Sequence, residues 1–308
     1  MNRYEYTSLS PHIYNKKWLT LILILAILYI GFLFYKNYFQ KKDHLEGFSQ
    51  IEKFVVKQNK QVYDEFYADI YDAIHTPSRY TPFLMKLLLN NTQVSEKSTF
   101  LDVGSGTGHL LNELTELGYN AYGIDQSKDM VQHCSQKYPD TTVTHGNVED
   151  PLSFENRTFS HILCLYYTIY HMKNKNIFFE NSSHWLLPGG YLIIHLVEPD
   201  KVDTTIPANW NSMFMNSKKT ESTLEINDIH YKHVYKYNPS KKEAILTETF
   251  TDHQTQNIRQ NEQTLYMNSI EEILTIAKYN GFISRGIIQI KELNEDEHQF
   301  IYILERIG

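Results

Sequence analysis

The longest uninterrupted apolar run of the chain lies near its N-terminus, where residues 18–35 read WLTLILILAILYIGFLFY without a charge. A helix of this length extends about 27 Å, close to the hydrocarbon thickness of a thin bilayer. Lysines flank both ends of the run, and Trp18 and Tyr35 suit the two membrane–water interfaces. A helix buried in a water-soluble protein would show a polar face, and this run has none. The pattern predicts a transmembrane helix over 18–35, preceded by a tail over 1–17.

A cleaved signal peptide is the alternative interpretation of this segment. Its apolar region is usually shorter and small residues should follow it, whereas residues 35–40 read YKNYFQ. The segment is therefore interpreted as a single uncleaved anchor. Charge does not set its orientation, because basic residues on the two sides balance: Arg3, Lys16 and Lys17 against Lys36, Lys41 and Lys42. Residues 36–57 mix polar and apolar positions and are assigned to a juxtamembrane linker.

An aromatic stripe marks the start of the remaining domain, which is assigned to residues 58–308. Within residues 61–72, aromatic and apolar side chains recur at helical spacing: Tyr63, Phe66, Tyr67, Ile70 and Tyr71. Such a stripe either packs into the core or closes over a ligand, and the spacing fits both. Pro77 and Pro82 are then expected to break the chain before a helix over 83–89.

From residue 99 onward, short apolar strands alternate with amphipathic helices. This alternation is typical of a doubly wound α/β fold, in which a mostly parallel sheet carries helices on both faces. Late in the chain, Ser269 and two early acids open a helix that Gly281 ends. Seven core strands are predicted, over 99–103, 120–125, 142–146, 159–165, 191–197, 283–291 and 300–304, with helices over 109–117, 127–138 and 173–187.

Residues 200–267 exceed what such a core needs. Alternating side chains predict strands over 231–237, 243–251 and 263–267, so the segment is interpreted as a β-rich insertion between the fifth strand and the last helix. It forms either a lid or pocket wall for a substrate, or an extension of the sheet or a contact between subunits.

Three glycines follow the first core strand at alternate positions, in residues 102–108, which read DVGSGTG. Glycine allows a sharp turn and a close approach to a ligand, because a Cβ would block the contact or forbid the dihedrals. The loop leads into a helix, as in the first crossover of a nucleotide-binding sheet. A dinucleotide site would place the third glycine one residue later, at His109. Asp102 would repel a pyrophosphate and favour a cationic ligand.

The pattern D-x-G-x-G-x-G, formed by Asp102, Gly104, Gly106 and Gly108, resembles motif I of the class I S-adenosylmethionine-dependent methyltransferases. The L-x-P-G-G run at 186–190, before a hydrophobic strand, is a second mark of that family. The resemblance covers roughly residues 60–200 well and 268–308 loosely. It implies a Rossmann-like methyltransferase fold with S-adenosylmethionine as the cofactor.

The resemblance also implies a cofactor site. Asp102 would hold the amino group of the cofactor, Asp125 would bind the ribose from the end of the second strand, and Asn147 would frame the adenine. The family more often has Asp where this chain has Asn147, and an amide can still accept from the exocyclic amine. The expected cofactor-binding residues are Asp102, Gly104, Ser105, Gly106, Thr107, Gly108, Asp125, Gln126, Asn147, Val148 and Leu165.

Two candidates for a catalytic role, Tyr170 and His171, follow the fourth strand, where ligands of such sheets bind. His171 matches a histidine that is common in small-molecule methyltransferases at this point, and both residues could instead cap the next helix. Methyl transfer from a sulfonium chiefly requires alignment of the reacting atoms, and a base is needed only where the acceptor must lose a proton. The absence of an obvious catalytic constellation therefore fits this chemistry.

Composition narrows the acceptor. The formal charge of −7 argues against a general nucleic-acid binder, and the chain has no N/D-P-P-Y run of the kind used on nucleic acid. Cys134 and Cys164 are too few for a disulfide framework or a zinc site, and no metal-ligand spacing is present, so no metal is expected.

The predicted function is in-line transfer of a methyl group from S-adenosylmethionine to a small-molecule or lipid-like acceptor. The chain would be a single-pass membrane protein, held through residues 18–35, with its catalytic domain facing the cytosol, where the cofactor is made. Two alternatives stay open. An NAD-dependent oxidoreductase would share a carboxylate such as Asp125, and a non-catalytic membrane adaptor would retain the fold without chemistry.

Overall fold

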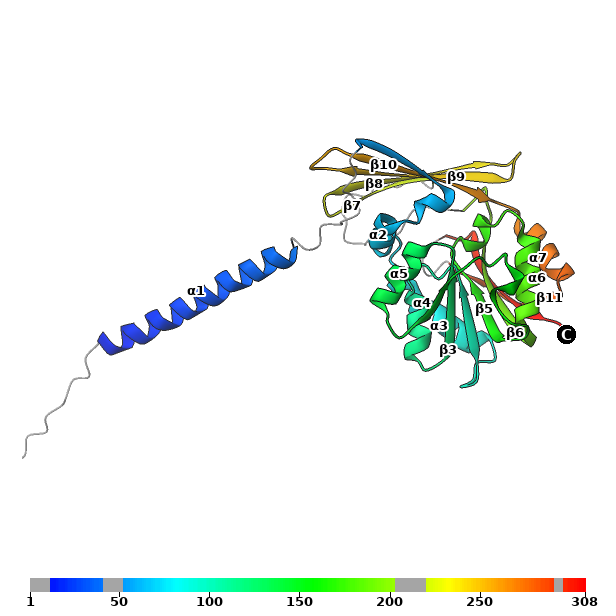
Figure 1. Cartoon of the computed structure of the whole chain (residues 1–308), viewed down its shortest axis with the longest axis horizontal. Helices are drawn as coiled ribbons and strands as arrows, with labels where there is room; N and C mark the ends of the chain where they lie inside the picture. Colours follow the sequence, from blue (N-terminus) through cyan, green and yellow to red (C-terminus); the bar gives the residue numbers. More distant parts are fainter. Residues whose placement is uncertain (1–11, 41–51, 203–219, 291–295) are drawn as a thin grey trace, which may run out of the picture. The chain divides into compact units, whose positions relative to one another are not determined.

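The computed structural model describes residues 12–40, 52–202, 220–290 and 296–308 (Figure 1). The chain divides into two compact units, Met1–Glu46 and Gly47–Gly308. Four predicted segments fall partly outside the described residues: the tail at 1–11, the linker at 41–51, the β-rich insertion at 203–219 and the strand over 283–291 at its last residue.

The first unit contains α1 (His12–Gln40), a helix of 29 residues that includes the predicted stretch 18–35. Its described side chains are those of Trp18 and residues 20–33, and its large apolar side chains are exposed, from 44% at Leu33 to 63% at Leu28. Over the described residues, no helix combines the length and hydropathy that crossing a membrane requires.

The second unit is built on a seven-stranded sheet with the order β11-β12-β6-β5-β2-β3-β4. Neighbouring strands pair in parallel except at β12, which runs antiparallel to both β6 and β11. The mostly parallel seven-stranded sheet predicted from the sequence is therefore confirmed. Its strands are β2 (Thr99–Val103), β3 (Asn120–Asp125), β4 (Thr142–His145), β5 (Phe159–Cys164), β6 (Leu186–Val197), β11 (Phe282–Gln289) and β12 (Gln299–Arg306).

Helices cover both faces of this sheet, as a doubly wound fold requires. Successive residues of β5 point to opposite faces, so that Ile162 and Leu163 join two separate hydrophobic clusters. One cluster packs beneath α6 (Lys175–Trp185) and α7 (Ile270–Tyr279). The other packs beneath α3 (Pro77–Asn91), α4 (His109–Glu116) and α5 (Lys128–Lys137).

Local sequence signals explain most helix ends. Ser269 caps α7 and forms a capping box with Glu272, as the early acids predicted. The expected break at Pro82 is wrong, because α3 runs through it from Pro77 to Asn91. Pro82 lies near the start of the helix and removes one backbone donor, and the Thr81 hydroxyl donates to the Pro77 carbonyl beside it at 3.0 Å.

A second, five-stranded sheet has the order β1-β10-β9-β8-β7. Three of its strands overlap the predicted ones, namely β8 (Ile229–Asn238), β9 (Glu243–Asp252) and β10 (Ile258–Tyr266), of which β10 begins five residues earlier and ends one residue earlier than predicted. β7 (Glu221–Ile226) was not predicted. β1 (Phe54–Gln58) pairs in parallel with β10, so residues 54–57 belong to this sheet and not to the linker assigned from the sequence.

The chain enters the seven-stranded sheet through an aromatic segment that joins the two sheets. After β1 it forms a short 3₁₀ helix, η2 (Asn59–Val62), and then α2 (Glu65–His75), which Asp64 caps. Figure 1 shows the second sheet to one side of the larger α/β layer, with α2 beside it. In this arrangement, the aromatic side chains of α2 lie close enough to contact both sheets.

Candidate functional site

The glycine loop has the backbone that its sequence predicts. Gly104 adopts φ +68°, and a Cβ built on it would lie 2.8 Å from the Thr168 side chain. Gly108 adopts φ +82° at the N-terminus of α4, where a Cβ would lie 2.3 Å from the sulfur of Cys134. Both positions require glycine, because an L side chain would be strained by its dihedrals and would collide with a neighbour.

Asp125, at the carboxyl end of β3, connects the glycine loop to the next helix. Its Oδ2 accepts the Gly106 amide at 2.9 Å, and its Oδ1 accepts the Ser127 amide at 2.8 Å. Burial raises the pKa of this carboxyl. A carboxylate offers about four acceptor positions, so two remain for a ligand in the cavity that Asp125 lines.

Asp102 lies within β2 and is only 6% exposed. Burial, and then the nearby Asp125, raises its pKa from the ordinary 3.8 to about 7. The next side chain of the loop, Ser105, has a buried hydroxyl that makes no hydrogen bond within the described part of the chain. Thr107 instead donates to Asp72 of α2 at 2.6 Å, which ties the loop to the aromatic segment.

A cavity of about 520 Å³ lies at the carboxyl ends of the core strands. Ligands of open α/β sheets bind at this edge. Of the eleven residues expected to bind the cofactor, those that line the cavity are Gly104, Gly106, Asp125, Gln126, Val148 and Leu165. Those that do not line it are Asp102, Ser105, Thr107, Gly108 and Asn147. Asn147 accepts hydrogen bonds from the Gln126 side chain and the Glu149 amide, so it positions the loop that lines the cavity.

The second sheet forms the opposite wall of this cavity. Alternate residues of β8, namely Tyr231, His233 and Tyr235, line it, together with Glu248 of β9 and Gln263 of β10. The sequence predicted that side chains alternate along β8, and this alternation places Tyr231, His233 and Tyr235 on one face of the strand. Residues of the insertion therefore line the cavity.

The two catalytic candidates separate in the structure. Tyr170 is fully buried, and its hydroxyl accepts from the Val197 amide at 2.8 Å and donates to the Val197 carbonyl at 3.3 Å. It does not line the cavity, because η4 (Thr168–His171) turns it toward β6. The structure therefore gives Tyr170 packing and backbone contacts away from the cavity, and of the two candidates only His171 reaches it.

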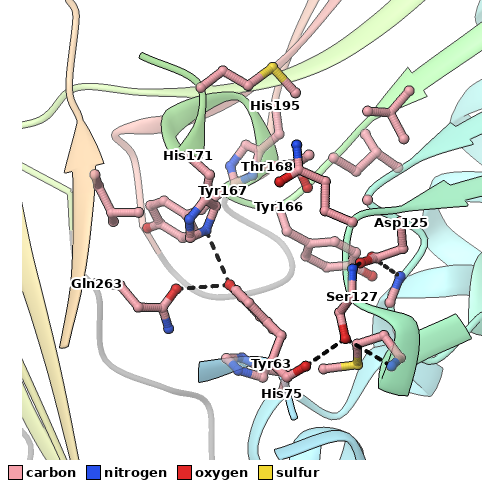
Figure 2. Close-up of a pocket in the computed structure, with 18 of the residues that line it drawn as sticks. Tyr63, His75, Asp125, Ser127, Tyr166, Tyr167, Thr168, His171, His195 and Gln263 are labelled. Atoms are coloured by element: carbon pink, nitrogen blue, oxygen red, sulfur yellow. Dashed lines mark hydrogen bonds between the residues drawn. The ribbon is translucent and has the colours of Figure 1, made fainter. Parts of the chain in front are cut away.

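His171 lines the cavity, and its Nε2 lies 3.3 Å from the Tyr63 hydroxyl. Burial, followed by the charge of Lys175, lowers its pKa to about 4, so the imidazole is neutral at pH 7. Tyr63 also donates to Gln263 at 2.9 Å, and its carbonyl accepts from Ser127 (Figure 2). A single tyrosine thus touches the segment after Asp125, the second sheet and His171.

Other residues of the cavity were not predicted as site residues. His195 of β6 is 4% exposed, lines the cavity and has an Nε2 that makes no hydrogen bond among the described residues. Glu248 is 1% exposed and accepts from Tyr67 and Tyr231. Within the described ranges, no group of three or more His, Cys, Asp or Glu side chains is placed to hold a metal ion.

Known proteins that are similar to this chain are methyltransferases. Residues 101–194 match the family model described as a methyltransferase domain. The dTDP-3-amino-3,4,6-trideoxy-alpha-D-glucopyranose N,N-dimethyltransferase of Streptomyces venezuelae is 27% identical over 158 residues, 49% of this chain and 64% of that enzyme. The chain spans 52 to 64% of the length of the first curated relatives it matches.

Solved structures agree in fold. The CcbJ methyltransferase of Streptomyces caelestis superposes with a TM-score of 0.63 at 15% identity, over 81% of this chain and 99% of that chain. An S-adenosylmethionine-dependent methyltransferase of Clostridium acetobutylicum superposes with a TM-score of 0.60 at 16% identity, over 79% and 98% of the two chains. The second unit therefore has a Rossmann-like methyltransferase fold.

Proposed function

We propose that the protein transfers a methyl group from S-adenosylmethionine to a small-molecule acceptor. The observation that carries this proposal is the cavity itself, which runs from the glycine loop and Asp125 to His171 beneath the second sheet. The match of residues 101–194 to a methyltransferase domain supports the same chemistry.

The residues present fit the cofactor. The left-handed Gly104, whose missing Cβ leaves room beside Thr168, lets the backbone approach a ligand, and Ser105 holds a buried hydroxyl without a partner among the described residues. Asp125 would accept the ribose hydroxyls, and Val148 would pack against the adenine. Asp102 is buried behind the glycine loop. Its negative charge would attract the cationic amino group of the cofactor. Bound S-adenosylmethionine supplies an activated methyl group on a sulfonium sulfur.

The acceptor would lie on the side of the cavity formed by His171 and the second sheet. Holding the acceptor atom in line with the methyl group and the sulfur can supply much of the rate acceleration. A neutral His171 can accept a proton from an acceptor that must lose one. We therefore propose His171 as the general base, with Tyr63 holding its ring in place.

Calorimetric titration of the full chain, purified in a mild detergent, tests this function. S-adenosylmethionine and S-adenosylhomocysteine are expected to bind in the micromolar range, and Asp125→Ala is expected to abolish that binding. Asp129→Ala, a carboxylate in the first turn of α5, serves as the control. Binding of NADH alone would favour the oxidoreductase alternative. A folded protein that binds none of the three ligands would favour the adaptor alternative.

We further propose that α1 anchors the protein in a membrane, with the catalytic domain on the cytosolic side. The support is the uncharged run 18–35 and the exposed apolar side chains described within it. The protein should stay in the membrane pellet after alkaline carbonate extraction, and Ile24→Lys with Leu28→Lys should release it. Glycosylation at the exposed sequons of Asn90 or Asn156, seen as a glycosidase-sensitive mobility shift in a eukaryotic host, would contradict the cytosolic orientation.

A further inference from the structure

Glu248 places a buried carboxylate in the wall of the cavity. Its side chain comes from the middle of β9, is 1% exposed and lines the space that the second sheet closes. Its Oε1 accepts the Tyr67 hydroxyl at 2.8 Å and the Tyr231 hydroxyl at 2.9 Å. Its Oε2 accepts the Gln263 side-chain amide at 3.4 Å, a long hydrogen bond. The second oxygen therefore keeps acceptor capacity.

These donors and the Asn261 amide, which also favours the ionised carboxyl, are uncharged, so they do not neutralise a carboxylate. Removing a carboxylate from water without an opposite charge is unfavourable, and burial accordingly raises the pKa of Glu248. A cation that entered the cavity would supply the missing charge. Buried carboxylates in proteins are ordinarily paired with such a charge, and here the space beside the carboxylate is the cavity.

Aromatic rings surround the same position. Tyr67 has ring contacts with Tyr63 at 5.4 Å and with Tyr71 at 5.9 Å between centroids, and the ring of Tyr231 lies 5.1 Å from that of Phe250. Tyr63, Tyr67, Tyr71 and Tyr231 all line the cavity. The faces of aromatic rings carry partial negative charge and attract ammonium groups, above all where water is excluded. A carboxylate and several tyrosine rings thus converge on one part of the cavity.

We propose that the acceptor carries an ammonium group, and that Glu248 and the tyrosines around it bind this group. The proposal rests on the proposed function, since it names the chemical class of the acceptor for that same site. It assigns the aromatic stripe of α2 to ligand recognition, one of the two roles that its spacing left open.

Matched ligands with and without a positive charge test the proposal. The full chain, saturated with S-adenosylhomocysteine, is titrated by calorimetry with tetramethylammonium, choline and benzyltrimethylammonium. The uncharged control is 3,3-dimethylbutan-1-ol, which has the shape of choline with carbon in place of nitrogen. We expect at least one cation to bind about tenfold or more tightly than the alcohol. Equal or weaker binding of all three cations would overturn the proposal.

Glu248→Gln keeps the shape of the side chain and removes its charge. It should weaken binding of the cations by about tenfold or more and leave binding of the alcohol unchanged. Glu243→Gln, the same substitution on the same strand outside the cavity, should change neither. Tyr71→Leu provides a second variant should Glu248→Gln fail to fold, because it removes a ring that makes no hydrogen bond to Glu248 among the described residues. It should weaken binding of the cations alone, by several-fold. Cation affinity unchanged in the folded variants would overturn the proposal.

The cofactor also carries positive charge, so its binding is measured in the same variants. If Glu248 serves the acceptor, Glu248→Gln should change the affinities for S-adenosylmethionine and S-adenosylhomocysteine equally or not at all. A selective loss of S-adenosylmethionine, which alone has the sulfonium charge, would assign Glu248 to the cofactor and overturn the proposal. If the wild-type chain binds neither cofactor but still binds the cations through Glu248, the proposed function fails while the cation site stands.

Discussion

The Tyr63 hydroxyl lies 3.3 Å from Nε2 of His171, although the two residues are 108 positions apart in the chain. The backbone carbonyl of Tyr63 accepts from Ser127, whose amide donates to Asp125. A chain of contacts therefore connects the carboxylate proposed to bind ribose with the histidine proposed to act as a base. Figure 2 shows this arrangement, with Tyr63 between Ser127 on one side and His171 and Gln263 on the other.

Asp125→Asn should weaken binding of S-adenosylmethionine by about 10- to 100-fold. The carboxamide keeps one acceptor oxygen, but it loses the charge that strengthens hydrogen bonds to ribose hydroxyls and to the Gly106 amide. Calorimetry measures the loss. An affinity within about twofold of wild type would show that Asp125 does not bind the ribose.

The affinity for S-adenosylmethionine should fall as the pH drops below 7. Asp102 has a pKa of about 7 in the free protein, raised by burial and then by Asp125. A cationic amino group favours the ionised form, so its binding lowers this pKa and releases a proton. Affinity should decrease by up to about tenfold per pH unit as the pH falls below 7. Calorimetry in buffers of different ionisation enthalpy measures both effects.

Asp102→Asn is the control variant. It should weaken cofactor binding and, at the same time, increase the stability of the fold. A carboxyl whose pKa is higher in the folded state than in the unfolded state loses stabilisation as the pH rises from 3.8 to about 7, by ~1.4 kcal/mol per unit of pKa elevation. The asparagine variant should therefore unfold at a higher temperature than wild type at pH 8 while binding the cofactor less tightly. A pH dependence that persists in this variant would assign the titration to another group, such as Asp125.

His171→Ala should lower kcat by about 10²- to 10⁴-fold where the acceptor must lose a proton, with little change in cofactor affinity. Because the pKa of His171 is lowered to about 4, the imidazole is already neutral, and its titration should add no inflection to the rate near pH 6.5. Steady-state release of S-adenosylhomocysteine measures the rate. Tyr170→Phe, a neighbouring substitution outside the cavity, should leave kcat within about threefold of wild type. A large loss of kcat in that variant alone would reverse the assignment.

The sequence predicted the parts of the site that depend on one segment at a time. The apolar strand 120–125 ends in Asp125, so its place at the sheet edge follows from strand polarity, and the alternate glycines predict the backbone of the loop. Glu248 was not predicted as a site residue, and Tyr63 was placed only on a stripe that fits either core packing or ligand closure, because both reach the cavity only when the second sheet packs over the first. Tyr170 and His171 are adjacent in a 3₁₀ turn that sends their side chains to different surroundings, which spacing could not distinguish.

Gly104→Ala should destabilise the fold and impair cofactor binding together, by two separable effects. The residue has φ +68°, which costs an L residue ~1 kcal/mol, and its Cβ would lie 2.8 Å from the Thr168 side chain. Removal of the neighbouring side chain in Gly104→Ala with Thr168→Ala should relieve the contact and leave the dihedral strain. Chemical unfolding of the two single variants and the double variant measures the coupling.

The expected result is that the double variant is more stable than Gly104→Ala and less stable than Thr168→Ala, with partial recovery of cofactor affinity. Gly118→Ala is the matched control, because Gly118 has φ +83° but nothing within 4 Å of its Cβ position. It should show the dihedral strain alone and leave cofactor affinity unchanged, since it ends α4 away from the cavity. Equal losses of stability in Gly104→Ala and Gly118→Ala, without coupling to Thr168, would mean that only backbone strain requires glycine at 104.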